Sequence, residues 1–237
     1  MIKNYLLNML KKLVIFFNNR LRLKSQPSSP ADLYFEDVSK NSYESFKKYF
    51  KDSFVFSDDN SIRNFAINEA IKKFDKENLF LEFGVFKGDS INLFAKNLKK
   101  INAEIFGFDS FKGLKNEWMT EEFNPPGTFD LKGKRPRVAN NVQLIDGWVE
   151  ETSKNFFSKN IKKIAFIHFD LDTYESTSFV LKSIKKSLQP GSIILFDQFY
   201  GFPNWEKYEY KAFKEEIEEN KFKFIAFGSR QACIKII

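Results

Sequence analysis

Cysteine and histidine are almost absent from this 237-residue sequence, which has one of each, Cys233 and His168. A single cysteine excludes an intrachain disulfide and any zinc site built on several cysteines, so we expect a reducing, cytoplasmic location. Long apolar runs are also missing. The longest near the start, Leu13–Phe17, has five residues, whereas a membrane-spanning helix needs roughly 20. No small-residue cleavage site follows that run, so we expect no secretory signal.

Apolar and aromatic residues, in contrast, are plentiful. Hydrophobic residues make up 43% of the chain, and phenylalanine alone contributes 30 residues. With that apolar fraction the chain is not broadly disordered. It can build a sizeable core, and one large α/β domain is the simplest organisation for its length.

The positive charge is concentrated near the N-terminus. The net charge is +7, and residues 1–24 supply six lysines and arginines, with no acid before Asp32. The rest of the chain is therefore close to neutral, with a net charge of +1. A nucleic-acid-binding domain normally carries a basic face on its folded body, so we expect no nucleic-acid partner.

Residues 1–24 have the pattern of an amphipathic helix, because apolar residues recur at three- to four-residue spacing between Ile2 and Phe17. Two interpretations are open. The basic arm docks on an anionic membrane surface, or it packs on its own domain or on a second copy of the chain in a homo-oligomer. A linker rich in proline and serine, residues 26–30, follows. We therefore divide the chain into an arm with its linker, residues 1–40, and a folded domain, residues 41–237.

From residue 79 onward, strand patterns alternate with helix patterns. The expected strands are Leu79–Phe83, Glu104–Asp109, Val142–Asp146, Ile164–Asp170 and Ser192–Asp197, followed by the hairpin strands Lys223–Phe227 and Gln231–Ile236. The expected helices are Tyr43–Phe50, Ile62–Phe74, Ile91–Lys99, Lys154–Asn160, Thr177–Leu188 and Glu206–Glu219. This alternation predicts an α/β fold. We expect a Rossmann-like, doubly wound and mostly parallel seven-stranded sheet, with an antiparallel C-terminal strand and helices on both faces.

Acidic residues recur at the ends of these strands. Four strands end on an aspartate, namely Asp109, Asp146, Asp170 and Asp197, and the first strand carries Glu82 near its end. In an open α/β sheet, ligands bind at the carboxyl ends of the strands. Capping of the following helices explains some of these acids. The remainder indicate a cationic or polyhydroxyl ligand, a metal ion, or both.

The loop after the first strand has an acid, Glu82, before two spaced glycines, Gly84 and Gly88. Glycines there let the backbone turn sharply and approach a ligand closely. The loop matches neither Gly-x-Gly-x-x-Gly nor the phosphate-binding loop, and an acid at this place repels a pyrophosphate. It favours instead the amino and sulfonium groups of S-adenosylmethionine, while Asp109, after the second strand, is placed to hold ribose hydroxyls.

Three segments resemble one family: Glu82–Ser90, Gly107–Leu114 and Asp170–Thr177. Together they resemble the class I methyltransferases of the macrocin O-methyltransferase group, which methylate sugars in macrolide and aminocoumarin biosynthesis. The resemblance covers about residues 79–215. It implies S-adenosylmethionine as methyl donor, a sugar or glycoconjugate hydroxyl as acceptor, and the strand order 3-2-1-4-5-7-6.

The same resemblance assigns the residues that bind the donor. It places Glu82, Gly84, Gly88 and Ser90 along the methionine part, Asp109 at the ribose, and Asp146 with Gly147 near the adenine.

The resemblance further implies a divalent metal, Mg²⁺, held by Asp170, Asp197 and the residue after Asp197. The implied proton acceptor is Asp172, which lies two residues beyond Asp170 and so on the same side of an extended strand. The family usually has two consecutive acids where this chain has Asp197 and Gln198. An amide oxygen still ligates a hard cation, but the lost charge predicts weakened Mg²⁺ binding. In the alternative interpretation, Asp172 and Glu175 only cap the following helix and no metal binds.

Other residues also have two interpretations. The histidine at 168 lies inside an apolar strand, and we expect it to be a hydrogen-bonded core residue rather than a catalytic one. Residues 115–140 form a long connection typical of a lid or binding loop, whose Arg135 and Arg137 either pair with an acidic substrate group or are solvated. The aromatic residues after the fifth strand either stack on a sugar or belong to the core: Tyr200, Phe202 and Trp205.

The sequence therefore predicts an S-adenosylmethionine-dependent O-methyltransferase that acts on a sugar or glycoconjugate hydroxyl with the help of a divalent metal. Two alternatives stay open. One is a protein that binds the cofactor but is catalytically impaired and serves in binding or membrane docking, for which Gln198 argues. The other is a nicotinamide-dependent oxidoreductase, against which the missing Gly-x-Gly-x-x-Gly loop argues.

Overall fold

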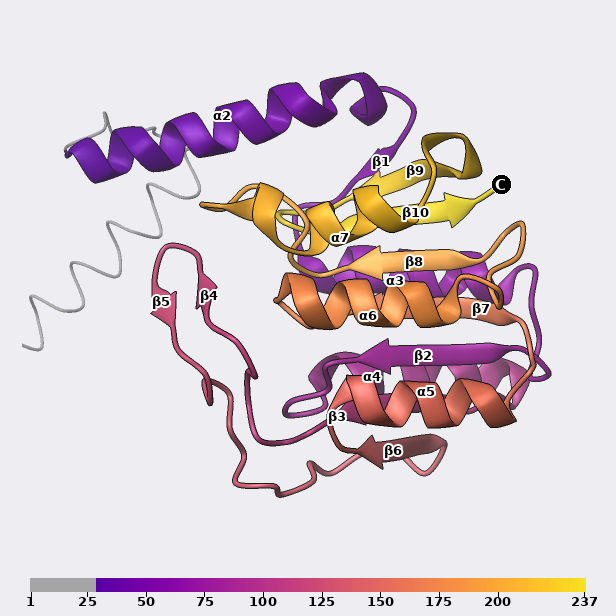
Figure 1. Cartoon of the computed structure of the whole chain (residues 1–237). Helices are drawn as coiled ribbons and strands as arrows, with labels where there is room; N and C mark the ends of the chain where they lie inside the picture. Colours follow the sequence, from indigo (N-terminus) through magenta and orange to yellow (C-terminus); the bar gives the residue numbers. More distant parts are fainter. Residues whose placement is uncertain (1–28) are drawn as a thin grey trace, which may run out of the picture. The chain divides into compact units, whose positions relative to one another are not determined.

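The computed structural model describes residues 29–237 (Figure 1). The expectations for residues 1–28, which are the amphipathic helix and most of the linker, lie outside the described residues. The described chain separates into a short unit that ends at Asp37 and a large unit, Val38–Ile237. Within residues 29–237, none of the helices combines the length and the hydropathy that a membrane crossing requires.

An eight-stranded sheet forms the centre of the large unit, in the order β6-β3-β2-β7-β8-β10-β9-β1 (Figure 1). Its strands are β1 (Phe54–Val55), β2 (Leu79–Phe83), β3 (Ile105–Asp109), β6 (Val142–Asp146), β7 (Ile164–Phe169), β8 (Ile193–Phe196), β9 (Phe222–Phe227) and β10 (Ala232–Ile236). Strand β10 runs antiparallel to both of its neighbours, and the other pairings in the sheet are parallel.

The predicted strand order, 3-2-1-4-5-7-6, is confirmed, because the seven predicted strands correspond to β2, β3, β6, β7, β8, β9 and β10 in chain order. The sequence pattern does not predict the eighth strand, β1. It has only two residues, Phe54 and Val55, paired in parallel with β9, and so short a segment has no alternation to detect. The fold is the Rossmann-like, doubly wound sheet that was expected.

Helices cover both faces of the sheet (Figure 1). The helices of residues 29–237 are α2 (Pro30–Phe50), α3 (Asp59–Ile71), α4 (Asp89–Leu98), α5 (Val149–Lys159), α6 (Tyr174–Ile184) and α7 (Glu209–Glu216), with short 3-10 turns at Lys99–Ile101, Trp205–Lys207 and Glu219–Lys221. Helices α5, α6 and α7 lie on one face, and α3 and α4 lie on the other (Figure 1). The long connection from β3 to β6 carries a separate antiparallel pair, β4 (Trp118–Met119) and β5 (Phe123–Asn124).

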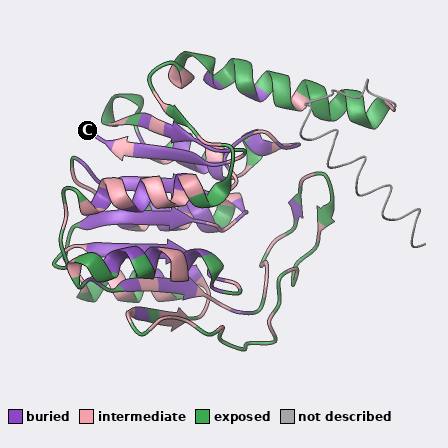
Figure 2. Cartoon of the chain, turned by 180° about the vertical axis from the view of Figure 1, so that it is seen from behind, coloured by how far each residue is buried: buried purple, intermediate pink, exposed green. Residues whose placement is uncertain are grey.

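The central strands are buried along their whole length (Figure 2). Because helices cover both faces, β2, β7 and β8 read as nearly continuous apolar runs, as buried parallel strands do. On the face of α5 to α7, the rings of Phe83, Phe169 and Phe196 stack in a row, with centroids 5.6 and 5.0 Å apart. The central strands β2, β7 and β8 contain two ionisable residues, Glu82 and His168, both fully buried, and these lead to the functional site.

Helix α2 begins earlier than the sequence pattern predicts. The expected helix was Tyr43–Phe50, whereas the observed one begins at Pro30, inside the segment expected to be a linker. The Oγ of Ser29 accepts a hydrogen bond from the Asp32 amide at 3.2 Å. A serine cap followed by proline at the first helical position is a favoured helix start, which explains the difference.

Candidate functional site

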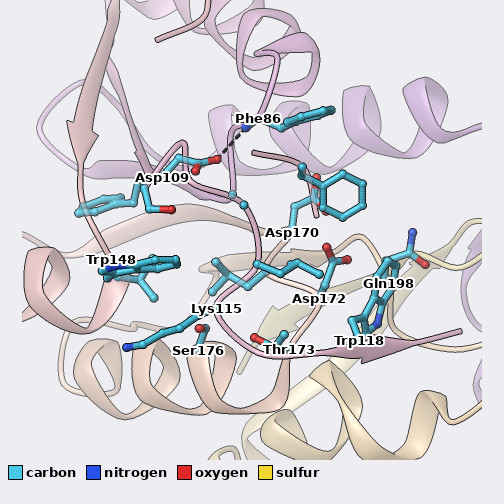
Figure 3. Close-up of a pocket in the computed structure, with 18 residues that line it drawn as sticks. Phe86, Asp109, Lys115, Trp118, Trp148, Asp170, Asp172, Thr173, Ser176 and Gln198 are labelled. Carbon is cyan, nitrogen blue, oxygen red and sulfur yellow. Dashed lines mark hydrogen bonds between the residues drawn. The ribbon is translucent and has the colours of Figure 1, made fainter. Parts of the chain in front are cut away.

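A cavity of about 240 Å³ lies at the carboxyl ends of the central strands (Figure 3). Five residues predicted for the site line it: Gly84 after β2, Asp109 at the end of β3, Asp170 and Asp172 after β7, and Gln198 after β8. The topology brings them together because β2 lies between β3 and β7. The strand order reverses there, and ligands of doubly wound folds bind at such a point.

The turn at Gly84 requires a glycine. Its φ is +88°, and a Cβ at this position would lie 1.9 Å from the backbone oxygen of Asp170. The loops after β2 and β7 therefore meet backbone to backbone beside the cavity, which is a contact that only glycine permits.

We expect Gly84→Ala to lower the free energy of unfolding by at least about 2 kcal/mol, because the methyl group must displace the loop of Asp170 as well as adopt a left-handed backbone. Thermal unfolding followed by circular dichroism measures the loss. The matched control is Gly127→Ala, because Gly127 has a φ of +86° but nothing within 4 Å of its Cβ position. That control should lose only about 1 kcal/mol, and equal losses for both variants would contradict the steric argument.

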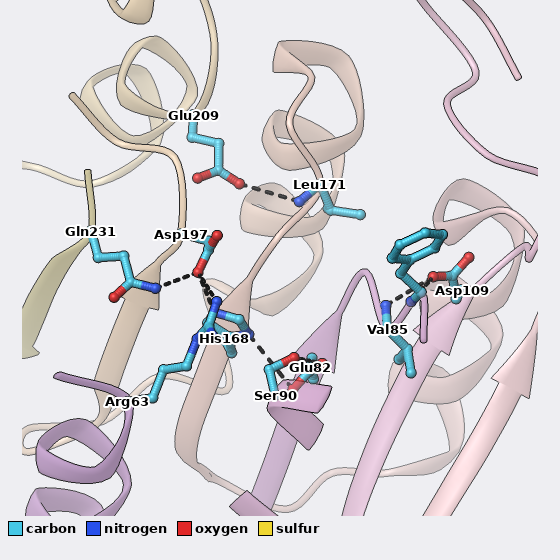
Figure 4. A network of polar contacts seen from close by, with 11 residues as sticks. Arg63, Glu82, Val85, Ser90, Asp109, His168, Leu171, Asp197, Glu209 and Gln231 are labelled. Carbon is cyan, nitrogen blue, oxygen red and sulfur yellow. Dashed lines mark hydrogen bonds and ion pairs between the residues drawn. The ribbon is translucent and has the colours of Figure 1, made fainter. Parts of the chain in front are cut away.

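The Asp109 carboxylate holds two loops together (Figures 3 and 4). Its Oδ2 accepts hydrogen bonds from the backbone N–H groups of Val85 and Phe86, each at 2.8 Å, and its Oδ1 accepts one from Phe111 at 2.7 Å. A carboxylate has about four acceptor positions, so one is left for a ligand. Asp109 thus fixes the glycine loop after β2, and its role at the ribose stays a prediction.

Asp170 and Asp172 place two carboxyl groups in the cavity wall. Within residues 29–237, neither carboxylate has an ion-pair or hydrogen-bond partner. Burial, followed by repulsion from Asp197 and Asp172, raises the pKa of Asp170 well above its ordinary value. Burial and the charge of Asp197 raise the pKa of Asp172 to about 7. Such a cavity favours a ligand that carries positive charge.

The backbone conformation that places Asp172 in the cavity wall is not the one predicted from the sequence. Strand β7 ends at Phe169, and Asp172 has a left-handed backbone with a φ of +61°, so the segment is not the extended strand that the spacing of two residues assumes. Helix α6 has Thr173 as its N-cap and no side-chain cap bond, so capping does not account for Asp172. A non-glycine residue in this conformation costs about 1 kcal/mol or more, and such residues cluster at functional sites.

Three of the four residues predicted along the methionine part are not in the cavity wall. Glu82 is fully buried, and its Oε1 accepts a hydrogen bond from the Oγ of Ser90 at 2.8 Å. Gly88, with a φ of +86°, is the N-cap residue of α4, and a Cβ there would lie 3.6 Å from the Cβ of Pro136. Of the four residues predicted along the methionine part, only Gly84 lines the cavity.

A row of charged side chains lies under these loops (Figure 4). Arg63 of α3 pairs with Asp197 through its NH2 and the aspartate Oδ1, which are 2.6 Å apart. The same Oδ1 lies 3.4 Å from the Nε2 of His168, whose Nδ1 lies 3.6 Å from the Oε2 of Glu82. The Nε2 of Gln231 also donates to Asp197. The prediction that His168 lies in the core is confirmed by its full burial. The hydrogen bonds expected for it are not found, because neither ring nitrogen has a hydrogen-bond partner among the described residues, and the ring lies in an ionic network instead.

The protonation of this network follows from its neighbours. Burial alone would lower the pKa of His168, but contacts with Asp197 and Glu82 raise it to about 10. Neither ring nitrogen makes a hydrogen bond of ordinary geometry, so ion pairing holds the ring in place. Burial raises the pKa of Glu82. For Asp197, burial acts in the same direction but is outweighed by His168 and Arg63, which bring its pKa below the ordinary value.

Glu209, in the first turn of α7, holds the two strand-end loops. It is fully buried, its Oε1 accepts the Leu171 amide at 3.3 Å, and its Oε2 accepts the Gln198 amide at 3.2 Å. Burial, followed by the charge of Asp172, raises the pKa of Glu209 well above its ordinary value. The sequence shows Glu209 only as one acid among several in a helix, so no local pattern could single it out.

The predicted metal ligands do not fit a divalent cation. The Oδ1 of Asp197 is taken by Arg63, His168 and Gln231. Gln198 is neutral, so the predicted set keeps only the carboxylate of Asp170 and the second oxygen of Asp197, whose charge Arg63 already balances. Within residues 29–237, no group of three or more histidine, cysteine, aspartate or glutamate side chains is placed to hold a metal ion. We therefore derive no step of the reaction through Mg²⁺.

Asp146, which is predicted to lie near the adenine, does not line the cavity. Its Oδ2 pairs with the Nε of Arg135 at 2.7 Å, so this arginine of the long connection binds the protein's own acid. The Gly147 amide donates to the Asp109 carbonyl at 3.0 Å. Trp148, the next residue, is in the cavity wall and offers an aromatic surface there.

The long connection from β3 to β6 forms part of the cavity wall through Lys115, Trp118 and Phe129 (Figure 3). The hairpin β4–β5 in this connection is held in place by Tyr208 and Arg230. The Tyr208 hydroxyl accepts the Met119 amide at 2.9 Å and donates to the Met119 carbonyl at 3.3 Å. Glu121, at the tip, pairs with Arg230 at 2.6 Å. This arrangement supports the expectation of a binding loop.

We expect Tyr208→Phe to loosen the hairpin without unfolding the protein, because it removes both hydrogen bonds to Met119 but keeps the ring. Amide hydrogen exchange in residues 117–124 should become about tenfold faster, the effect of losing one or two net hydrogen bonds. Tyr49→Phe is the control, because it removes a tyrosine bond to Glu219 far from the hairpin in sequence. Unchanged exchange in Tyr208→Phe would show that other contacts hold the hairpin.

The aromatic residues after β8 belong to the core rather than to a sugar-binding surface. Tyr200, Phe202 and Trp205 are all buried and do not line the cavity. The Tyr200 hydroxyl donates to the Gly228 carbonyl at 2.6 Å, so the protein itself satisfies it. Phe46 of α2 packs on Tyr200 and Trp205, with ring centroids 5.3 and 5.4 Å apart.

Known proteins share this architecture. Residues 81–199, half of the chain, match a family described as a methyltransferase domain. No curated protein matches the sequence. Among solved structures, the calicheamicin methyltransferase CalS11 is 21% identical with a TM-score of 0.60, covering 91% of this chain and 96% of that chain. The O-methyltransferase NovP is 15% identical with a TM-score of 0.54, covering 75% and 78%. An O-methyltransferase from Bacillus cereus, solved in complex with SAH, is 12% identical with a TM-score of 0.50, covering 95% and 97%.

The sheet order and the cavity at its switch point define a class I methyltransferase fold. The chain belongs to the methyltransferase-domain family, in the S-adenosylmethionine-dependent class.

Proposed function

We propose that the protein transfers the methyl group of S-adenosylmethionine to a hydroxyl of a sugar or glycoconjugate, with Asp172 as the general base. One observation carries the proposal: a single cavity is lined by Gly84 and Asp109 on the side of β2 and β3, and by Asp170 and Asp172 on the side of β7. The acceptor class is supported by the similar fold of CalS11, a TDP-rhamnose 3'-O-methyltransferase.

The donor fits the charge of this cavity. S-adenosylmethionine carries a sulfonium and an ammonium group, and Asp170 faces the cavity without a cationic partner. Gly84 lines the cavity with a left-handed backbone, at a φ of +88°, and the methionine part would lie along this turn. Asp109 keeps one acceptor position for a ribose hydroxyl, and the Trp148 ring offers a surface for the adenine. After transfer the sulfur is neutral, so the product loses part of this attraction and can leave.

The reaction needs a hydroxyl oxygen in line with the S–C bond and a group to take its proton. Holding that alignment is worth about 7–11 kcal/mol of the barrier, and a positioned base adds roughly 10²–10⁴-fold. The oxygen forms a bond to the methyl carbon, the S–C electron pair returns to sulfur, and the hydroxyl proton passes to Asp172. With its pKa raised to about 7, Asp172 has the basicity that a general base near neutral pH requires.

The cavity wall also offers groups that can bind the acceptor. Trp118 and Phe129 line the cavity and come from the hairpin connection, with ring centroids 6.5 Å apart. Aromatic rings present an apolar face on which the C–H side of a sugar can pack. Gln198 lines the same cavity, and its Oε1 is buried without a hydrogen-bond partner. A second hydroxyl of the acceptor would satisfy that oxygen.

The test is to incubate the protein with S-adenosylmethionine and a panel of nucleotide sugars, free sugars and phenols, and to quantify S-adenosylhomocysteine by mass spectrometry. We expect product above the acceptor-free background with at least one carbohydrate. Methylation of the phenols alone would contradict the acceptor class. Calorimetry with S-adenosylhomocysteine and with NADH examines the donor separately: binding of NADH alone would contradict the whole proposal.

A further inference from the structure

The protein supplies its own positive charge to Asp197. The NH2 of Arg63 lies 2.6 Å from the Oδ1 of Asp197, with side-chain exposures of 16% and 12%. His168 lies 3.4 Å from the same oxygen, and Gln231 donates to it. These partners come from α3, from β7 and from the turn before β10 (Figure 4), so three separate parts of the fold converge on one carboxylate.

Arg63 has no other anionic contact that explains its burial. Its ion pair with Asp197 is its one salt bridge within residues 29–237, and its Nε is buried without a partner. A buried guanidinium is stable only when it is paired and hydrogen-bonded. Each partner of this ion pair therefore stabilises the burial of the other: Asp197 neutralises the guanidinium of Arg63, and Arg63 neutralises the carboxylate of Asp197.

A divalent metal at Asp197 would have to share this carboxylate with the guanidinium of Arg63, which lies 2.6 Å from its Oδ1. Like charges a few ångströms apart repel strongly in an enclosed site, and hard cations are bound by several anionic oxygens. The neighbouring position offers the neutral amide of Gln198 in place of a second acid. The positive charge of Arg63 and the missing negative charge at Gln198 therefore act in the same direction.

We propose that Arg63 is the resident counter-ion of the strand-end carboxylates, and that Asp170, Asp197 and Gln198 consequently do not assemble a divalent-cation site. Arg63 is a positioning residue, because it acts on the site by fixing Asp197. The inference goes beyond the proposed function and does not depend on which acceptor is methylated. A protein that binds no metal but methylates nothing would count against the proposed function alone.

The test uses Mn²⁺ as a spectroscopic stand-in for Mg²⁺, because carboxylate and carbonyl oxygens suit both ions. Free Mn²⁺ is titrated by electron paramagnetic resonance against the full chain, without donor or acceptor. We expect the wild-type protein and Gln198→Asp to show no site with a Kd below about 1 mM. We expect Arg63→Ala combined with Gln198→Asp to bind Mn²⁺ about a hundredfold more tightly, because a repelling charge is removed and an attracting one is added.

The matched control is Arg135→Ala combined with Gln198→Asp. It makes the same change of net charge but removes an arginine that pairs with Asp146 instead, so it should stay without a Mn²⁺ site. A wild-type site tighter than about 1 mM would overturn the proposal, and so would equal Mn²⁺ affinity in the two double variants. If Arg63→Ala does not fold by circular dichroism, Arg63→Gln in the same background keeps a hydrogen-bond donor for Asp197 while removing the charge, and the same result is expected.

Discussion

Asp172→Asn should lower kcat at least about a hundredfold while leaving the affinity for S-adenosylhomocysteine unchanged, because the amide keeps the shape of the side chain but cannot accept the hydroxyl proton. The geometry supports this expectation. Asp172 lines the cavity, lacks any partner within the described chain, and has a pKa raised to about 7 by burial and by Asp197. The measurement is steady-state turnover with an acceptor from the carbohydrate panel, together with calorimetry for the product.

Glu175→Gln is the control for this prediction. Glu175 is an exposed acid in the first turn of α6, it does not line the cavity, and it shares with Asp172 the helix-capping interpretation. Turnover should survive that substitution. If both variants lose the same small factor, or if Asp172→Asn keeps more than about a tenth of the activity, the assignment of Asp172 as the base fails.

The second large effect concerns Asp109. Asp109→Ala should weaken binding of S-adenosylhomocysteine about a hundredfold, since hydrogen bonds to a charged group are worth about 1.5–3 kcal/mol each. The loss has two sources. The ribose loses its acceptor, and the amides of Val85, Phe86 and Phe111 lose theirs, which frees the glycine loop. Isothermal titration calorimetry below the melting temperature measures the affinity.

Asp58→Ala provides the comparison for Asp109. Asp58 also accepts a backbone amide, that of Ser61 at 2.9 Å, but as the N-cap of α3 and away from the cavity. Its loss should reduce stability by about 1 kcal/mol and leave product affinity unchanged. Unchanged affinity in Asp109→Ala would remove Asp109 from the donor site, and an equal effect in both variants would mean that general destabilisation is the cause.

The sequence predicts the frame of this site well. Periodicity locates β2, β3, β6, β7 and β8 to within a residue or two, since alternation and apolar runs are local properties. Once the order of the strands is known, their carboxyl ends must share one edge. Asp109, Asp170, Asp172 and Gln198 could therefore be placed together from the sequence, and all four line the cavity.

The same reasoning could not tell which acids face a ligand and which face the interior. Glu82 and Asp170 both look like strand-end acids, but Glu82 is fully buried and bonded to Ser90, whereas Asp170 lines the cavity. Nor could it find the partners of Asp197. Arg63 lies 134 residues before it and Gln231 lies 34 residues after it, and neither belongs to a recognisable motif.

What the sequence patterns determined by themselves were the class of fold and the strand ends at which acidic residues gather, because these depend on patterns that neighbouring residues carry. The order of the strands followed from the resemblance to a methyltransferase family. Tertiary structure alone decided the charge state of these strand ends. Arg63, His168 and Glu209 converge on them from α3, β7 and α7. Buried charges are stable only when they are paired. Which residues lie close enough to pair is decided by the packing of the helices and strands and not by spacing along the chain.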